Sequence, residues 1–313
     1  MGARGMTDIV KDAKQVGVLF LSYGSPSDKR ALIPYMTSIR RGRTPTDCEV
    51  QNLVNRYEVI GQWTDQSLST MAKRQCHVLQ DLLPSVPTAI GYLHMQPSIG
   101  DAVADLVKCG VSHIVAIVTA PFYSALGTGA YEQRVDAAVS EYPHVTSEFI
   151  RHWWDQPAFI DYWMTAIQGY LQSHKFDKAE TTVVFSAHSV PVVDAVSADG
   201  YADSLRAGAE RIAQRLGLPH WSLAWQSAGS HGQWLGPTVQ DAIEEAVQNG
   251  FRHIVFVPFG FVSNHVEVLY DNDIECRDFV EAGGARYGCV PMPDDDVRFI
   301  RAMADAITER IRL

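Results

Sequence analysis

The sequence contains few cysteines, and none of them forms a closely spaced pair. Its five cysteines lie far apart and without a Cys-x-x-Cys motif, at Cys48, Cys76, Cys109, Cys276 and Cys289. Disulfide frameworks and zinc or iron–sulfur centres need cysteines that are paired or clustered. We therefore expect neither kind of site, and we expect a reducing compartment, the cytoplasm.

The chain also has little positive charge and no long hydrophobic run. Its 26 Lys and Arg residues against 36 Asp and Glu residues give a net charge of -10, which argues against a broad nucleic-acid-binding surface. The apolar run from Ile254 to Val262 is short and is broken by Pro258 and Gly260, so we expect no membrane span. A P-loop, a Gly-x-Ser-x-Gly elbow and a Gly-x-Gly-x-x-Gly turn at a strand end are missing too, which disfavours kinases, hydrolases and dehydrogenases.

What the chain does contain is a segment from Thr182 to Pro191 that is typical of a buried parallel strand. Its apolar run stops at His188, which stands between small residues and is followed by a proline. Open α/β sheets bind ligands at the carboxyl ends of their strands, so we expect His188 to face such a crevice. The alternative is a strand-end histidine that only binds a loop carbonyl.

The sequence also resembles itself. Residues 97–115 align with residues 237–255 at an offset of 140 and without a gap. Each copy reads as a helix that begins near a proline, ends at a glycine and is followed by a hydrophobic strand. A period this long is typical of two similar lobes rather than of a solenoid. We therefore predict an α/β protein with two pseudo-symmetric lobes, each a mostly parallel sheet flanked by helices.

The first lobe carries an insertion that is rich in arginine. The strand-end residues Tyr23 and His188 correspond in the repeat, and 74 positions separate Tyr23 from Pro97 whereas 49 separate His188 from Pro237. The difference of about 25 residues falls around Arg40, Arg41, Arg43 and Arg56. Guanidinium groups bind carboxylates with two hydrogen bonds, so a ligand-binding insertion and a solvated basic surface are both open.

Three carboxylates follow the second strand of the second lobe at regular spacing. Glu267, Asp271 and Glu275 would share one face of an α-helix. Like charges at this spacing repel one another. A row of oxygen ligands that leads a divalent cation to a site would explain the arrangement, and a solvated acidic face is the alternative.

Several motifs together resemble the ferrochelatase family. They are Ile39-Arg-Arg-Gly-Arg43, Arg56-Tyr-Glu-x-Ile-Gly61, Ser186-Ala-His-Ser-x-Pro191, Trp225-Gln-Ser227, Trp234-Leu-Gly-Pro237 and Phe261-Val-Ser-x-His-x-Glu-x-Leu-Tyr-Asp271. The resemblance implies two flavodoxin-like, chelatase-like lobes. The first would span residues 16–150, with the insertion at about 30–70, and the second residues 151–313, with the catalytic His and Glu and a closing helix.

The resemblance also implies an activity, the insertion of Fe(II) into a porphyrin during haem biosynthesis. The Tyr-Gly-x-Pro turn at Tyr23 resembles the monoderm bacterial members, which convert coproporphyrin III to Fe-coproporphyrin (coprohaem). By the same resemblance, His188 accepts pyrrole protons and contacts iron, Glu267 is its partner carboxylate, and Tyr23 is the axial ligand of the iron product. Asp271 and Glu275 would continue the cation path. The residues expected to bind the porphyrin are Tyr23, Arg40, Arg56, Tyr57, Thr64 and Tyr131.

Cofactors, partners and alternatives follow from the same resemblance. We expect a monomer without an organic cofactor or an iron–sulfur cluster, with room for an accessory Mg(II), and a transient contact with a downstream enzyme of haem synthesis. A protoporphyrin IX ferrochelatase, a cobalt or nickel chelatase of related fold, and a haem-binding or haem-delivery protein are the alternatives. The chain departs from the family pattern at Thr64-Asp65-Gln66, where relatives commonly have Ser-Pro-Leu, at Asn264 in place of Asp, and at Phe122 in place of a polar residue.

Overall fold

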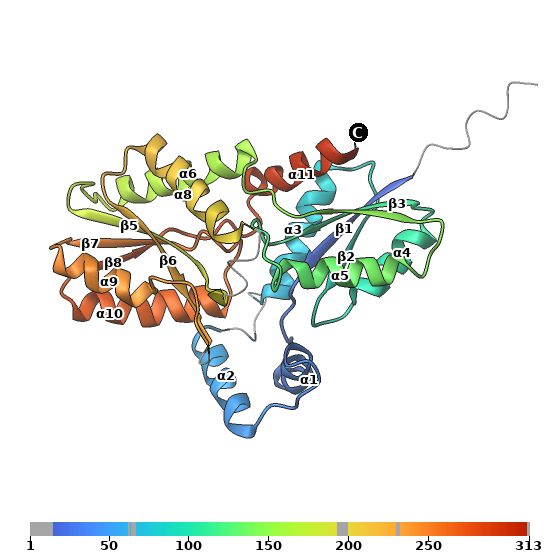
Figure 1. The fold of residues 1–313 in the computed structure, drawn as a ribbon, viewed down its shortest axis with the longest axis horizontal. Helices are drawn as coiled ribbons and strands as arrows, with labels where there is room; N and C mark the ends of the chain where they lie inside the picture. Colours follow the sequence, from blue (N-terminus) through green and yellow to red (C-terminus); the bar gives the residue numbers. More distant parts are fainter. Residues whose placement is uncertain (1–14, 62, 64–66, 193–199, 230–231, 312–313) are drawn as a thin grey trace, which may run out of the picture.

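The computed structural model describes residues 15–61, 63, 67–192, 200–229 and 232–311. It contains two four-stranded parallel sheets with the orders β2-β1-β3-β4 and β6-β5-β7-β8 (Figure 1). The strands of the first sheet are β1 (Val16–Ser22), β2 (Thr88–Tyr92), β3 (His113–Val118) and β4 (Thr146–Ile150). Those of the second are β5 (Thr181–His188), β6 (Trp221–Gln226), β7 (His253–Val257) and β8 (Arg286–Cys289). The matching orders confirm the prediction of an α/β fold with two pseudo-symmetric sheets.

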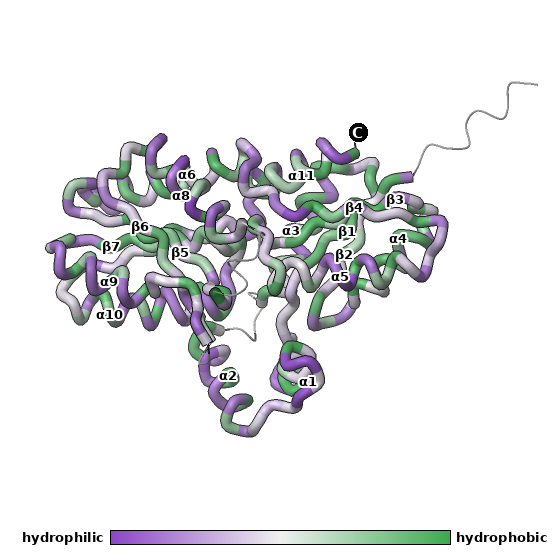
Figure 2. Tube along the Cα trace, in the orientation of Figure 1, coloured by the Kyte–Doolittle hydropathy of each residue, from purple (hydrophilic) through white to green (hydrophobic). Residues whose placement is uncertain are grey.

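Helices cover both sheets. They are α1 (Lys29–Ile39), α2 (Asp47–Val59), α3 (Leu68–Leu82), α4 (Ile99–Lys108), α5 (Thr128–Val139), α6 (Pro157–Ser173), α8 (Tyr201–Leu216), α9 (Val239–Gln248), α10 (Arg277–Ala282), α11 (Val297–Ile311) and the π-helix η1 (Glu267–Cys276). Figure 2 shows hydrophobic residues gathered along the strands that these helices enclose. This explains why β1 and β5 are nearly continuous apolar runs. Among the described residues, no helix combines the length and hydrophobicity that a membrane crossing requires.

The internal repeat has the same local chemistry in both copies. Ser98 caps α4 and Thr238 caps α9, and each forms a capping box with an aspartate three residues later. The strand before each helix is held in the same way, because the Tyr92 amide donates to the Pro97 carbonyl and the Trp225 amide to the Pro237 carbonyl, both at 2.9 Å. The alignment of residues 97–115 with 237–255 thus reflects real structural equivalence.

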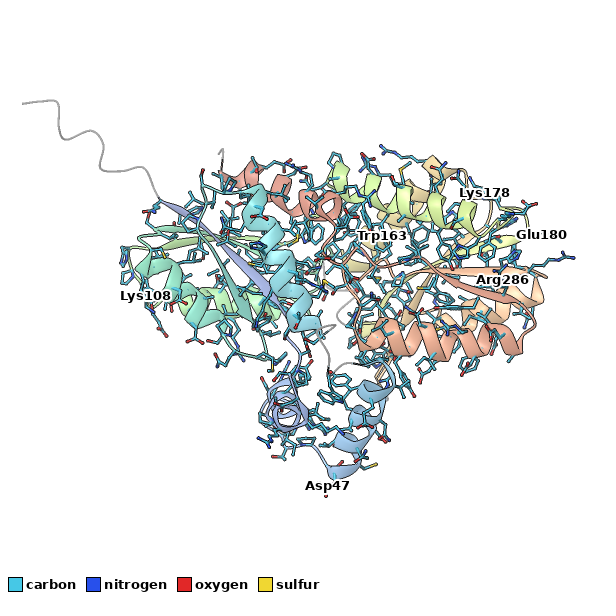
Figure 3. The ribbon with its side chains drawn as sticks, turned by 180° about the vertical axis from the view of Figure 1, so that it is seen from behind. Asp47, Lys108, Trp163, Lys178, Glu180 and Arg286 are labelled. Atoms are coloured by element: carbon cyan, nitrogen blue, oxygen red, sulfur yellow. The ribbon has the colours of Figure 1, made fainter. Side chains whose placement is uncertain are left out.

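The two sheets share one hydrophobic core. A single cluster of buried side chains includes Phe20 of β1, Phe185 of β5 and several aromatic rings between them. One of these is Trp163 of α6, which lies in the interior in Figure 3, while the labelled charged residues lie at the periphery. Helix α11 contacts α3 and β3 as well as α6, so the end of the chain packs across the first sheet. The division of the chain at residue 150 stays a prediction.

Helices α1 and α2 project away from both sheets (Figure 1). We call residues 29–59 the arm; they fall within the predicted insertion. A separate cluster of buried residues holds the arm together, at Leu32, Tyr35, Val54 and Tyr57. Tyr23 at the end of β1 and Val266 next to η1 pack against this cluster. The arm therefore contacts the strand end of one lobe and the helix start of the other.

Candidate active site

His188 is the last residue of β5, and its side chain is 41% exposed. Its Nδ1 lies 2.5 Å from the Ser189 carbonyl oxygen. Because a carbonyl only accepts hydrogen bonds, Nδ1 carries a proton. The Tyr201 hydroxyl donates to the His188 carbonyl at 3.1 Å and fixes the backbone at this point. The free ring nitrogen, Nε2, is therefore the atom that can accept a proton.

Glu267 begins η1 and faces two histidines. Its Oε1 lies 3.7 Å from Nε2 of His188, and its Oε2 lies 3.6 Å from Nε2 of His265. Nδ1 of His265 donates to the Ser263 carbonyl at 2.9 Å, so this ring too directs Nε2 at the carboxylate. His188 and Glu267 were predicted to share one site, and they lie together in the structure. No role was predicted for His265, although the His-x-Glu spacing was a usable signal.

The charges around Glu267 favour its ionised form. Burial raises the pKa of Glu267, but the contact with His265, the nearby His188 imidazole and the positive charge of Arg56 outweigh burial and lower it. Burial in turn lowers the pKa of His265, and its contact with Glu267 outweighs that effect and raises it. The centre therefore combines an anionic carboxylate with histidines able to take up protons.

The helix that carries Glu267 is wider than predicted. The prediction of an α-helix over Glu267, Asp271 and Glu275 is wrong, because residues 267–276 form a π-helix, in which hydrogen bonds join residues five apart. The Gln226 side-chain amide donates to the Glu267 carbonyl at 2.7 Å, and groups that insert into a helix ladder distort it. A four-residue spacing is close to one turn of such a helix, so the wider winding does not by itself separate the three carboxylates.

Asp271 and Arg56 bind each other. Their ion pair joins the arm to η1, and the Ser227 hydroxyl donates to the other Asp271 oxygen at 2.7 Å. The Arg56 guanidinium also lies 4.3 Å from the centre of the Tyr270 ring. Sequence analysis assigned Arg56 to the porphyrin and Asp271 to the cation path, and did not foresee this pair. Burial and the charge of Asp271 raise the pKa of Glu275, the next carboxylate of the helix.

Tyr23 occupies at β1 the place that His188 has at β5. Its ring packs edge-on against His94, with centroids 4.5 Å apart, and against Tyr35 at 6.3 Å. Burial and the negative charge of Glu267 raise the pKa of Tyr23, so its phenol is neutral at ordinary pH. Tyr23 and Val266, the residue before Glu267, pack against the same buried cluster of the arm, which places Tyr23 near the start of η1.

The other residues predicted to bind the porphyrin form an ion pair, pack against a ring or are buried in the core. Arg40 forms an ion pair with Glu49 inside the arm, at 2.5 Å. Tyr57 packs against Trp63 at 5.3 Å, and burial raises its pKa to about 12. Tyr131 is buried in the core of the first lobe. Thr64 lies outside the described residues. The roles of these residues stay predictions.

Two departures from the family pattern have structural explanations. Asn264 donates hydrogen bonds from its backbone and side-chain amides to the Asp294 carboxylate, at 2.9 and 3.1 Å, and so anchors the loop before His265. Phe122 is buried and stacks on Trp154, with ring centres 5.9 Å apart.

Within the described residues, no group of three or more His, Cys, Asp or Glu side chains is arranged to hold a metal ion.

Comparison with known proteins extends over almost the whole chain. The family model described as Ferrochelatase matches residues 15–311. The coproporphyrin III ferrochelatase of Bacillus subtilis strain 168 is 34% identical over 307 residues, which cover 95% of this chain and 98% of the relative. That of Staphylococcus epidermidis is 36% identical over 309 residues, which cover 95% of this chain and 99% of the relative.

Solved structures with low sequence identity show the same fold. The sirohydrochlorin chelatase SirB of Bacillus subtilis subspecies spizizenii, in complex with cobalt, superposes with a TM-score of 0.60 at 10% identity and covers 95% of this chain and 96% of its own. CbiX, described as the terminal enzyme of sirohaem biosynthesis in denitrifying bacteria, gives a TM-score of 0.53 at 12% identity and covers 94% and 98%. These matches show the chelatase-like fold alone.

Proposed function

Because the chain belongs to the ferrochelatase family, we propose that it inserts ferrous iron into coproporphyrin III and releases Fe-coproporphyrin, a step of haem biosynthesis. The observation that carries this proposal is the meeting of His188 and Glu267, which come from different elements and lie 3.7 Å apart. The choice of coproporphyrin III is supported by the relatives of that name, at 34% and 36% identity, and by Tyr23.

The reaction exchanges two pyrrole protons for one Fe(II) ion, and the site has acceptors for both. Nε2 of His188 accepts the first proton, because its Nδ1 already donates to a carbonyl. Glu267 stabilises the imidazolium that forms and, as an ionised carboxylate, accepts the second proton. His265, whose Nε2 lies 3.6 Å from the other Glu267 oxygen, holds the carboxylate in place. Tyr23 would offer its hydroxyl oxygen to the iron product as axial ligand, and would release its proton to solvent when it binds as a phenolate.

Arginines and tyrosines around this centre would bind the carboxylates of the ring. Arg40, Arg56, Tyr57, Thr64 and Tyr131 are proposed as porphyrin-binding residues, of which Arg40 and Arg56 would meet propionates. Both arginines carry a carboxylate partner in the ligand-free structure, Glu49 and Asp271 respectively. A propionate would therefore replace one carboxylate partner of each arginine by another, and Asp271, released from Arg56, would become free to receive the cation.

The proposal needs no organic cofactor and no iron–sulfur cluster, because the exchange of protons for iron changes no oxidation state. An accessory Mg(II) on the Asp271–Glu275 side is compatible with it. We propose a cytoplasmic monomer that hands Fe-coproporphyrin to a downstream enzyme of haem synthesis through a transient contact.

Anaerobic insertion of Fe(II), assayed side by side with coproporphyrin III and protoporphyrin IX, tests the proposal. We expect the absorption bands of free-base coproporphyrin III to disappear with turnover, and faster than those of protoporphyrin IX. Heat-denatured protein controls for spontaneous insertion. Tight binding of haem without loss of the free-base bands would point to a delivery protein, and turnover with Co(II) or Ni(II) alone would point to a different chelatase.

A further inference from the structure

The end of β6 lies beside the catalytic histidine but has so far no function. Gln226 is the register partner of His188 in the sheet, and it is only 3% exposed. Ser227, the next residue, begins the loop that leaves the strand. The two residues contact β5, the loop that follows it, and η1.

Three hydrogen bonds leave this strand end. The Gln226 carbonyl accepts from the Ser189 amide at 2.8 Å, directly after His188. The Gln226 side-chain amide donates to the Glu267 carbonyl at 2.7 Å, and the Ser227 hydroxyl donates to Asp271 at 2.7 Å. One strand end thus holds the loop after the histidine and the first turns of the helix that presents the carboxylate.

The geometry here costs free energy. Ser227 has a φ of 58°, a left-handed conformation that is unfavourable for residues other than glycine. The Gln226 side-chain oxygen is buried without a hydrogen-bond partner among the described residues. A buried amide whose oxygen lacks a hydrogen-bond partner adds little net stability. We therefore look for a role of the Gln226 amide other than stabilising the fold.

The Gln226 amide contacts the start of η1 and can affect its winding. The Gln226 amide occupies the carbonyl of the first residue of the helix, where an α-helix would receive a backbone amide. A side chain inserted there favours the wide winding of η1. The winding in turn determines where the Glu267 carboxylate lies relative to Nε2 of His188.

We propose that Gln226 is a positioning residue for metal insertion, whose side-chain amide keeps the start of η1 wide so that Glu267 faces His188. It acts through Glu267 and touches neither the metal nor the porphyrin. This inference rests on the proposed function and adds a residue to it.

Gln226→Met tests the inference, because it keeps the side-chain volume and removes the donor. Misplacing a reacting group by about 1 Å can cost about 100-fold in rate, so we expect kcat to fall roughly 10- to 100-fold. The KM for coproporphyrin III and the melting temperature should change little. As Glu267 moves away from His188, it stabilises the protonated imidazole less, so the acid limb of the pH profile of kcat should move to lower pH.

Gln80→Met is the matched control. The Gln80 side-chain amide also donates to backbone carbonyls, those of Leu83 and Val86 at 3.2 and 3.1 Å, but in α3 of the first lobe. This variant should retain the kcat and the pH profile of the native protein. Equal losses of kcat in the two variants, or an unmoved acid limb in Gln226→Met, would overturn the inference.

A second variant keeps the test decisive if Gln226→Met does not fold. Gln226→Asn retains an amide but withdraws it by one methylene, and it should show a smaller loss of kcat with the same direction of shift in the acid limb. Native kcat and pH profile in this variant would also overturn the inference. If the native protein does not metallate coproporphyrin III, the proposed function is wrong. If the native protein is active and the Gln226 variants have the same kcat and pH profile, only the role of Gln226 is wrong.

Discussion

The two lobes have the same framework and differ where the chemistry lies. Their strand orders match, and α4 and α9 carry the same capping box. Yet Tyr23 directly follows β1 where His188 ends β5. The helix after β3 is an ordinary α-helix, whereas the one after β7 is the π-helix that begins at Glu267. The repeated parts provide the scaffold, and the parts that break the repeat provide the site.

The arm is the second asymmetry. It is inserted after β1 only, and it contacts the other lobe through the pair of Arg56 and Asp271. In the proposed mechanism, the first lobe thus contributes Tyr23 and basic groups, while the second contributes the proton acceptors. The following experiments test this division of labour.

The largest effect is expected from His188→Ala. A general base contributes about 100- to 10,000-fold to a rate, so kcat for iron insertion should fall by this order. Porphyrin binding, measured by fluorescence titration, should remain within a few fold, because the arginines of the other lobe are intact. Turnover like that of the native protein would contradict the role of His188.

A double-mutant cycle of Arg56→Gln and Asp271→Asn should reveal the link between the lobes. The pair is largely shielded, with side chains 33% and 13% exposed, and hydrogen bonds between charged groups stabilise by about 1–3 kcal/mol. We expect a coupling energy of about 1 kcal/mol in the free energy of unfolding, after allowance for solvent. The exposed pair of Lys29 and Glu58 on the same arm is the control and should give no resolvable coupling. Equal coupling energies in the two cycles would show that the Arg56–Asp271 pair links the lobes no more strongly than an exposed pair does.

The stability that Glu267 contributes should depend on pH in a bell-shaped way. Its pKa is lowered from an ordinary 4.5, so its contribution is complete above about pH 4.5 and is lost as the pH falls through the lowered value. The pKa of His265 is raised from 6.5, so its contribution is complete below about pH 6.5 and is lost as the pH rises through the raised value.

Glu267→Gln removes both contributions. Urea unfolding from pH 3.5 to pH 9 should therefore show the largest difference between the native protein and the variant at roughly pH 4.5–6.5. Glu309→Gln, a change on the surface helix α11, is a control. A difference that is flat across this range would exclude the ion pair.

The smallest effect on stability is expected for Tyr23→Phe. The phenol ring still packs against His94, so the melting temperature should change little. The visible spectrum of bound ferric coproporphyrin should change, because the phenolate ligand is lost. An unaltered spectrum would remove the assignment of Tyr23 as axial ligand.

Much of the scaffold and the centre of the site could be predicted from the sequence. Strand ends are marked by apolar runs that stop at polar residues, and the repeat showed that Tyr23 and His188 are equivalent. The contact between His188 and Glu267 followed from the rule that strand ends of parallel sheets meet at one edge.

The remaining features depend on tertiary contacts that no local pattern encodes. The Arg56–Asp271 pair joins residues 215 positions apart, and each residue alone suggested a ligand. The winding of η1 depends on the Gln226 amide, which comes from another strand. Periodicity alone therefore favoured an α-helix, and tertiary structure overrode it.

The buried rings between the two sheets also fix the distance between β1 and β5. Phe259 packs on Phe159 at 5.5 Å, and Trp153 packs on Phe299 at 5.5 Å, within the cluster that joins β1 to β5. Such interiors are close-packed and resist compression. These packed side chains hold β1, which leads to Tyr23, at a fixed separation from β5, which ends in His188. Residues outside the proposed site thus determine how far apart its two halves lie.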